Sequence, residues 1–506
     1  LKKLNRFEEA VLSYKNAISL KANYAIAYSN LGNVLRELKE HDEALINFNK
    51  SIQANPNYAE AYSNQGVTLC EMGKYEEALK CHDKALSIMP HFAEAHTNRG
   101  ITLEKLLRFE DALSSHNKAI ELRPNYADAY SNRGIVFAAM MQFEAAIDSY
   151  KRALELEPYH AKTLSNLGVA YKEIFQFERS LECYEKAISV DPDYADAHWN
   201  KSLLLLLNAD FLNGWNLYEW RWKKLEFSKY KRNYSNPLWN GEAVLFGKTI
   251  LLYPEQGLGD TIQFCRYAKV LKTLGARVIL EVPYQLMGLM QSLDGVDLLL
   301  EAGQPLPDFD FHCPLLSLPR CFKTDLTTIP KSTVYLFAEG RKIDSWRERL
   351  GKKRYKRVGL VWSGNAEHSN DRNRSLSLST LISFLPSDIE YVCLQKEIRE
   401  SDKKFLTEVP VRHFEESIKD FTDTAALCEL MDLVISVDTS VAHLAGAMGK
   451  TTFLLLPYLP DWRWLLDRED TPWYSSMHLY RQTEERRWDS VLQKVADSLL
   501  KFSIEN

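Results

Sequence analysis

A repeat of fixed length constrains this chain more than any other feature. One short segment returns every 34 residues through the first two hundred residues. Its six copies are AYSNLG at 27–32, AYSNQG at 61–66, AHTNRG at 95–100, AYSNRG at 129–134, TLSNLG at 163–168 and AHWNKS at 197–202. A unit of this length holds two helices and a turn, and such units bury an apolar core only by stacking on one another. The pattern therefore predicts an array of helix pairs.

Three further columns repeat in phase with this segment. A glycine in each first helix lets a neighbouring helix approach closely, a small residue marks each second helix, and a proline closes each unit. The columns are Gly32, Gly66, Gly100, Gly134 and Gly168; Ala10, Ala44, Ala78, Ala112, Ala146 and Ser180; and Pro56, Pro90, Pro124, Pro158 and Pro192. This is the tetratricopeptide pattern. It predicts a TPR solenoid over residues 1–222, with a partial first repeat and six further repeats, the last of which is a degenerate cap.

The degenerate last repeat carries three tryptophans, Trp215, Trp220 and Trp222. Capping repeats are expected to be atypical. So many aromatic side chains predict that this cap packs on the following domain and forms a rigid joint.

The same spacing places an asparagine in every copy. The column comprises Asn30, Asn64, Asn98, Asn132, Asn166 and Asn200. In a solenoid the first helices line the concave surface, so these amides should follow one groove. Because an amide offers a donor and an acceptor, a row of amides can pair with the backbone of an extended peptide. The alternative is that each asparagine solvates its helix or bonds the next repeat.

The amino-acid composition bears on nucleic-acid binding, on membrane insertion and on the redox state of the cysteines. The chain has 506 residues, a net charge of −5 and 45% hydrophobic residues, which gives no general argument for nucleic-acid or membrane binding. No apolar run reaches the roughly 18 residues that a membrane-spanning helix needs. Eight cysteines without a CxxC pair indicate reduced thiols and a cytoplasmic protein. The chain begins inside a repeat, so it is expected to be a fragment, and a targeting signal is not excluded.

After residue 222 the pattern changes, and we expect a linker over 223–248. Short apolar runs then alternate with helical segments, as in parallel sheets with crossover helices. The predicted strands are 249–253, 277–281, 296–300, 358–363, 391–395, 433–438 and 451–457. They form two clusters, which predicts two α/β lobes of the nucleotide-binding fold. Residues 249–340 would form the lobe that holds an acceptor substrate (the acceptor side), and residues 341–506 the lobe that holds a nucleotide-activated donor (the donor side). A compact α/β pair of this kind is the GT-B architecture.

Four stretches of the second half carry candidate chemistry. The turn PEQGLGDTIQF (254–264) places Gly259 and Asp260 at a helix start, where Asp260 is either functional or simply an N-cap. The loop 362–381 holds Arg374, whose guanidinium suits phosphate, although an exposed polar loop is the alternative. The segment LLPYLPDWRWLLDREDTPWY (455–474) follows a strand, and it either contacts a base or ribose or forms a hydrophobic lid.

The fourth stretch, SVDTSVAHLAGAMGK (436–450), runs from a strand into a helix. Its backbone N–H groups at Thr439, Ser440 and Val441 form a candidate phosphate cradle after Asp438. His443 lies one turn further along. Lys396 follows the strand 391–395, and we expect it to help bind the same phosphate-bearing donor.

The second half resembles known glycosyltransferases at two of these stretches. GLGDTIQF is similar to the GxLGD segment of heptosyltransferases, and VDTSVAHLAGAMG is similar to their DTGxxHLAAAL segment. The resemblance implies that Asp260 is a general base and that Thr439, Ser440 and Val441 bind the donor phosphates. Arg374 corresponds to the basic residue of their KxWP-like loop, but the Trp-Pro pair is missing here, and Ser440 replaces a glycine. The whole chain resembles bacterial TPR glycosyltransferases, including those that modify flagellin, and has the plan of O-GlcNAc transferase.

The resemblance implies transfer of a sugar from a nucleotide-sugar donor to Ser or Thr of a polypeptide in the TPR groove. Asp260 and His443 are the expected catalytic residues. Because no acidic DxD pair stands at a strand end, a metal-independent, inverting reaction without a cofactor is expected. Two alternatives are a transferase for lipid or polysaccharide acceptors and a non-catalytic TPR adaptor. The sugar, with a CMP-nonulosonate or UDP-GlcNAc donor, stays open, as does the oligomeric state.

Overall fold

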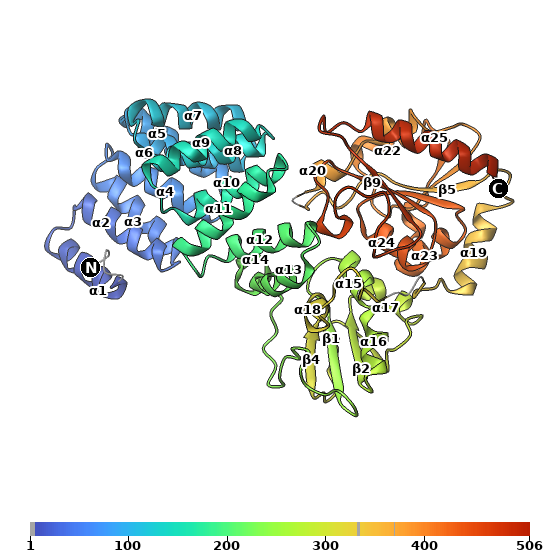
Figure 1. The fold of residues 1–506 in the computed structure, drawn as a ribbon. Coiled ribbons are helices and arrows are strands. Elements are labelled where there is room, and N and C mark those ends of the chain that lie inside the picture. Colours follow the sequence, from blue (N-terminus) through green and yellow to red (C-terminus); the bar gives the residue numbers. More distant parts are fainter. Residues whose placement is uncertain (1–5, 331–333, 369, 506) are drawn as a thin grey trace. The chain divides into compact units, whose positions relative to one another are not determined.

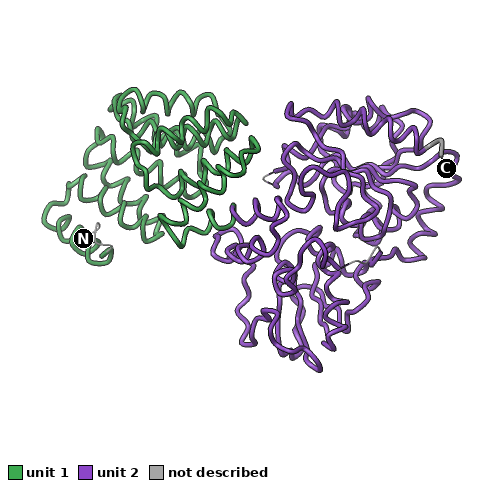
Figure 2. The backbone as a smooth tube through the Cα atoms, viewed as in Figure 1, with its two compact units in different colours: residues 1–200 green, residues 201–506 purple. Residues whose placement is uncertain are grey.

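The computed structural model describes residues 6–330, 334–368 and 370–505, with the side chains of 503–505 left aside. The chain divides into two compact units, residues 1–200 and 201–506 (Figure 2). Unit 1 is entirely helical, and unit 2 contains all ten strands of the described residues. The expected plan, a TPR solenoid followed by an α/β region, is confirmed.

Unit 1 is a stack of helix pairs joined by tight turns (Figure 1). The helices are α1 (Phe7–Leu20), α2 (Ala25–Glu37), α3 (His41–Ala54), α4 (Ala59–Glu71), α5 (Tyr75–Ile88), α6 (Ala93–Lys105), α7 (Phe109–Leu122), α8 (Ala127–Ala139), α9 (Phe143–Leu156), α10 (Ala161–Glu173), α11 (Phe177–Val190) and α12 (Ala195–Leu207). The predicted half-repeat at the start is α1, although residues 1–5 of that prediction lie outside the described residues.

The glycine column acts as predicted, because each glycine of a first helix lies under a ring of the second helix. A Cβ atom on Gly66 would stand 2.6 Å from His82 Cε1, and one on Gly134 would stand 2.5 Å from Tyr150 Cε1. Any side chain would therefore clash with the ring. The rings of this column, all buried, are Phe48, His82, His116, Tyr150 and Tyr184.

Unit 2 begins at Lys201, within α12, and continues with the second half of the degenerate repeat. It comprises α13 (Phe211–Tyr218), the 3-10 helix η2 (Glu219–Lys223) and α14 (Leu225–Ser228). These helices belong to the same compact unit as the two sheets, whereas the sequence placed them with the solenoid through residue 222. Trp215 is buried against Phe264 and Trp462 of the α/β region, so the tryptophan-rich segment does pack on it.

The first sheet has four parallel strands in the order β3-β2-β1-β4. They are β1 (Thr249–Tyr253), β2 (Arg277–Val282), β3 (Leu298–Glu301) and β4 (Phe311–Pro314). The segment expected as a linker pairs with this sheet, because Trp239 N donates to His312 O at 2.9 Å and Arg232 binds Glu281 at 2.6 Å. The ring of Tyr234 packs there edge-on to Tyr253 of β1.

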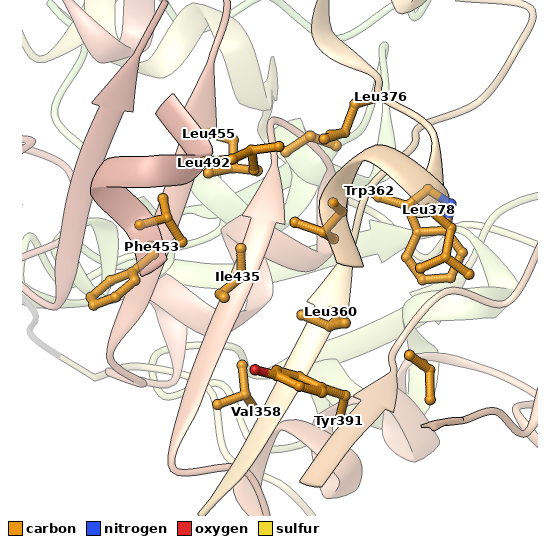
Figure 3. Packing of buried hydrophobic residues seen from close by; sticks show 14 of the residues in the cluster. Val358, Leu360, Trp362, Leu376, Leu378, Tyr391, Ile435, Phe453, Leu455 and Leu492 are labelled. Atoms are coloured by element: carbon orange, nitrogen blue, oxygen red, sulfur yellow. The ribbon is translucent and has the colours of Figure 1, made fainter. Parts of the chain in front are cut away.

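The second sheet has six parallel strands in the order β10-β9-β8-β5-β6-β7. They are β5 (Arg357–Val361), β6 (Glu390–Cys393), β7 (Val411–Arg412), β8 (Leu433–Val437), β9 (Thr452–Leu456) and β10 (Met477–Arg481). Every residue of β5, β8 and β9 is buried, as expected of strands covered on both faces. Their apolar side chains form one core with Leu492 of the last helix (Figure 3).

The helices of unit 2 connect these strands and join the two lobes. They are α15 (Leu258–Phe264), α16 (Tyr267–Thr273), α17 (Tyr284–Met290), α18 (Leu318–Cys321), α19 (Gly340–Leu350), α20 (Asp371–Arg374), α21 (Leu378–Ile382), α22 (Glu400–Leu406), α23 (Phe421–Glu429), α24 (Ser440–Ala447) and α25 (Asp489–Glu505). The lobes meet where α15 packs on α24 and α17 packs on α23. Within the described residues, no helix is both long and apolar enough to cross a membrane.

Candidate functional site

The strand order of the second sheet defines where a ligand would bind. Chain order runs outward from β5 through β6 to β7 on one side, and from β8 through β9 to β10 on the other. Such a sheet binds ligands beyond the carboxyl ends of its strands, at the point where the strand order reverses. That point lies between β5 and β8, so the loops after Val361 and Val437 form the candidate site.

The turn after β8 is the predicted phosphate cradle. Thr439 is the N-cap of α24, and Ser440 and Val441 open the helix. The first N–H groups of a helix have no partner inside it, and they carry a partial positive charge. The side chains of Thr439 and Ser440 are half-buried, and Val441 is buried. This turn can accept an anion on backbone N–H groups.

Arg374 lies beside this turn, as its assignment to the donor site requires. One of its guanidinium nitrogens, Nη1, donates to the carbonyl oxygen of Asp438 at 2.8 Å. Its guanidinium also packs on Gly364 in the loop after β5, where a Cβ atom would stand 2.6 Å from Arg374 Nη2. The Arg374 guanidinium therefore contacts both the loop after β5 and the turn after β8, which meet at the switch point.

Asp438 directly follows strand β8, and its side chain is 16% exposed. Burial, and then repulsion from Asp461, raise the pKa of Asp438 to about 6, because both disfavour the charged form. The Asp438 carboxylate faces His443 Nε2 at 3.9 Å.

Asp260 comes from the first lobe and lies at the third position of α15. The N-cap of that helix is Gly257, whose N–H donates to Asp260 Oδ2 at 2.8 Å. Asp260 is thus not the N-cap that the sequence offered as an alternative, although it does cap the helix locally. Its side chain stays 19% exposed.

Gly259 brings the two predicted segments together. A Cβ atom on Gly259 would lie 2.8 Å from His443 Cδ2 and 3.4 Å from Ser440 Cα. The start of α15 therefore packs directly on the start of α24, and the absent side chain permits it. Gly259 here serves helix contact, while its assignment to donor binding stays a prediction.

Arg463 is the residue of the candidate site that sequence reasoning missed. It lies in the 3-10 helix η5 (Trp462–Trp464), after β9, and forms an ion pair with Asp260 Oδ1. The same guanidinium donates to Gln263 Oε1 at 2.7 Å and to Asp461 Oδ1 at 2.9 Å. The one available signal was an arginine among the aromatic residues of 455–474.

The charge of Asp260 depends on this arginine. Burial raises the pKa of the Asp260 carboxyl above its usual value, and Arg463 opposes that rise. An opposite charge in contact favours the ionised form. Arg463 therefore favours the ionised carboxylate of Asp260.

His443 is enclosed by aromatic rings. Its Nδ1 lies 2.9 Å from the hydroxyl of Tyr474, and its ring stacks on Trp464 with centroids 5.4 Å apart. Burial, with Arg463, Arg266 and Arg374 nearby, holds the pKa of His443 well below its usual value. The ring is neutral near pH 7 and only 7% exposed, which suits packing between the lobes.

Lys396 is not brought to these groups by any contact in the described part of the chain. Its side chain is exposed, and Nζ donates to the carbonyl oxygen of Lys419 at 2.9 Å. Arg399 instead reaches the loop after β5, where it pairs with Asp371 and donates to Ser375 Oγ at 3.2 Å. Among the described residues, no group of three or more His, Cys, Asp or Glu side chains could hold a metal ion.

The asparagine column of unit 1 makes contacts between repeats. Asn64 Nδ2 donates to Ser29 Oγ at 3.4 Å, and Asn98 Nδ2 donates to Ser63 Oγ at 3.2 Å. Asn200 bonds Ser165 at 3.2 Å in the same way. All six asparagines are half-buried. The alternative role, a bond to the neighbouring repeat, is therefore present at these positions, and it uses the donor end of the amide.

Comparison with known families agrees with the repeat unit. Models described as tetratricopeptide repeat match residues 25–58, 57–125, 127–160 and 161–194. A model described as TPR repeat matches residues 1–38. Unit 1 is thus built of tetratricopeptide repeats.

The chain is similar to protein FlbA of Caulobacter vibrioides, with 24% identity over 331 residues. The match covers 60% of this chain and 54% of FlbA, so the chain spans about half the length of that curated relative. Among solved structures, YrrB, described as a TPR protein with an unusual peptide-binding site, is 29% identical and covers 38% of this chain and 98% of its own, with a TM-score of 0.30. TTC0263 of Thermus thermophilus, described as a thermophilic TPR protein, is 25% identical and covers 36% of this chain and 100% of its own, with a TM-score of 0.34.

Proposed function

We propose that this protein is a glycosyltransferase of GT-B architecture that moves a sugar from a nucleotide-sugar donor to a Ser or Thr hydroxyl of a polypeptide. The observation that carries the proposal is the switch point of the second sheet. There Arg374 and the 439–441 turn lie together, and Asp260 reaches the same place through the contact of Gly259 with α24.

The residues divide the reaction between them. Asp260 takes the proton of the acceptor hydroxyl, and the freed oxygen attacks the anomeric carbon of the sugar. The bond from that carbon to the phosphate oxygen breaks, with inversion at the carbon. Negative charge grows on the leaving phosphate, where Arg374 and the N–H groups of Ser440 and Val441 stabilise it.

TPR repeats suit the acceptor side, because stacked repeats offer an extended surface for peptides. In the asparagine column, the donor ends of Asn64, Asn98 and Asn200 bond serines of the preceding repeat. Their carbonyl oxygens are the groups that this proposal assigns to the backbone N–H groups of a bound peptide.

The deciding experiment compares Asp260→Asn with the unaltered chain. We expect transfer from UDP-GlcNAc or a CMP-nonulosonate to candidate acceptors, read by mass spectrometry, to fall by about 1,000-fold or more, while donor binding measured by calorimetry persists. Asp310→Asn is the matched control, because Asp310 also accepts a backbone N–H, from Thr249, at the opposite end of β1. Equal turnover in Asp260→Asn and the unaltered chain would remove Asp260 from the mechanism.

A second candidate function is a non-catalytic adaptor that uses only the repeats. The specific observation in its favour is that both oxygens of Asp260 are already engaged, one by Arg463 and one by Gly257. Such an adaptor would bind a partner polypeptide without binding or hydrolysing any sugar nucleotide. Calorimetry with the two donors separates the candidates.

A further inference from the structure

One face of α13 and η2 is buried against the α/β region. Phe211, Trp215, Tyr218 and Arg221 are spaced by four, three and three residues, and each is at most 2% exposed. This spacing places them on one side of a helix. In a repeat array that side would receive the next repeat. Here it receives the loop that carries Asp260 and the segment that carries Arg463.

The aromatic members of this face contact both of those segments. The ring of Trp215 lies edge-on to Trp462 at 5.0 Å and to Phe264 at 6.3 Å. The Gln256 amide donates to the Tyr218 hydroxyl at 3.2 Å. Gln256 lies in the turn before α15, and Trp462 precedes Arg463. One helical face thus contacts both the segment that carries Asp260 and the segment that carries Arg463.

Arg221 makes the tightest link to the turn. Its guanidinium is fully buried, and it donates from Nε to Glu255 Oε1 at 2.9 Å and from Nη2 to Ser317 Oγ at 2.7 Å. Its Nη1 donates to Glu219 Oε1 at 2.8 Å. Glu255 is 3% exposed and stands five residues before Asp260. A buried polar group that loses its hydrogen-bond partner is destabilised whether or not it is charged, so this contact fixes the position of the turn.

We infer that the face of α13 and η2 formed by Trp215, Tyr218 and Arg221 positions the 254–260 turn, and with it Asp260, for the reaction. Arg221 is the chief positioning residue, because it bonds the turn, η2 and Ser317 of the first lobe at once. The effect on turnover rests on the proposed function; the effect on the turn itself does not.

The test is Arg221→Met in the full chain, with Arg357→Met as matched control. Arg357 is also a buried arginine of unit 2 with a glutamate partner, Glu390 at 2.8 Å, but it lies at the amino end of β5. We expect Arg221→Met to lower kcat by about 100-fold, because a small misplacement of a catalytic group has that effect. The KM for the donor should stay unchanged, since the 438–441 turn belongs to the other lobe.

Hydrogen exchange supplies a readout that does not need activity. In Arg221→Met the backbone amides of the 254–264 segment, from residue 255 onward, should exchange at least about ten times faster, while those of 433–447 keep their rates. Arg357→Met should leave both kcat and exchange in 254–264 unchanged. Tyr218→Phe removes the bond to Gln256 and keeps the ring, so it folds more readily and should show the same exchange pattern at smaller amplitude.

The outcomes separate the two proposals. If the unaltered chain transfers no sugar, the proposed function fails, while faster exchange of 254–264 in Arg221→Met still supports the positioning role. If Arg221→Met and Tyr218→Phe leave exchange in 254–264 at the level of the unaltered chain, the positioning role is overturned, whatever the activity. If kcat stayed unchanged and the whole loss in kcat/KM came from a higher donor KM, the positioning role would be overturned as well.

Discussion

At the scale of single residues, Arg463 shows how one side chain sets the charge of another. Its guanidinium binds Asp260, Asp461 and Gln263 while only 9% of the side chain is exposed. Burial alone would favour the protonated form of Asp260. Arg463 favours the ionised form, so the two effects oppose each other in one contact.

Replacing Arg463 by Gln should therefore move the pH dependence of transfer. Without the cation the pKa of Asp260 rises, and a general base is lost as the pH falls through its pKa. We expect the acidic limb of kcat/KM against pH to shift to higher pH. Arg468→Gln is the control, since Arg468 pairs with exposed Asp470 in the same segment. An acidic limb unchanged in Arg463→Gln would mean that Asp260 is not the titrating base.

At the scale of the helix pair, two repeats place histidine where others place phenylalanine or tyrosine. His82 and His116 are fully buried under Gly66 and Gly100. Neither ring nitrogen of either histidine has a hydrogen-bond partner among the described residues. Burial lowers the pKa of each to about 4, because a charged ring would be desolvated there.

These histidines should make the repeat unit sensitive to acid. The pKa of each is lower in the folded chain than the value of about 6.5 in an unfolded one, so the unfolded state binds the proton more tightly. Their contribution to stability is fully present above about pH 6.5 and is lost as the pH falls toward 4, by up to about 3 kcal/mol for each histidine.

Replacement by tyrosine, as in Tyr150 and Tyr184, should flatten this dependence. We expect the melting temperature, followed by the helical signal, to fall less between about pH 6.5 and pH 4 in His82→Tyr/His116→Tyr than in the unaltered chain. His91→Tyr changes an exposed histidine and serves as control. Identical pH dependence in the double variant and the unaltered chain would contradict the prediction.

At the scale of the whole molecule, the proposed division of labour assigns the acceptor to unit 1 and the donor to unit 2. The asparagine column offers a test of this division of labour. The amides proposed to bind the acceptor also bond serines between repeats, so the two roles must be separated. Removing an asparagine therefore changes both the repeat interface and any peptide contact, whereas removing its serine partner changes the interface alone.

We expect Asn64→Ala/Asn98→Ala/Asn200→Ala to raise the KM for a polypeptide acceptor by about tenfold or more, the loss of one to two hydrogen bonds. Donor hydrolysis should not change. The matched variant Ser29→Ala/Ser63→Ala/Ser165→Ala should lower the melting temperature similarly and keep the acceptor KM. Equal acceptor KM values in both variants would assign the column to the repeat interface only.

Much of the fold could be read from local patterns. The 34-residue period predicted the helix pairs, and seven apolar runs predicted seven of the ten strands in the described residues. The missed strands carry weak signals: β7 has two residues, β4 is FHCP, and β10 alternates buried and exposed positions. The candidate site was found in part, through Asp260, Arg374 and the 439–441 turn, which lie in the segments that follow β1, β5 and β8.

The sequence by itself determined the repeat array and the position of each motif along its own strand and helix, because periodicity and capping act between residues close in the chain. Only the tertiary structure decided that Arg463 meets Asp260 across 203 residues, that Arg221 meets Glu255, and that asparagine amides bond serines of the preceding repeat. Those pairings depend on how separate elements pack. A buried charge takes whichever partner the packing brings within reach, and no local pattern of residues encodes that choice.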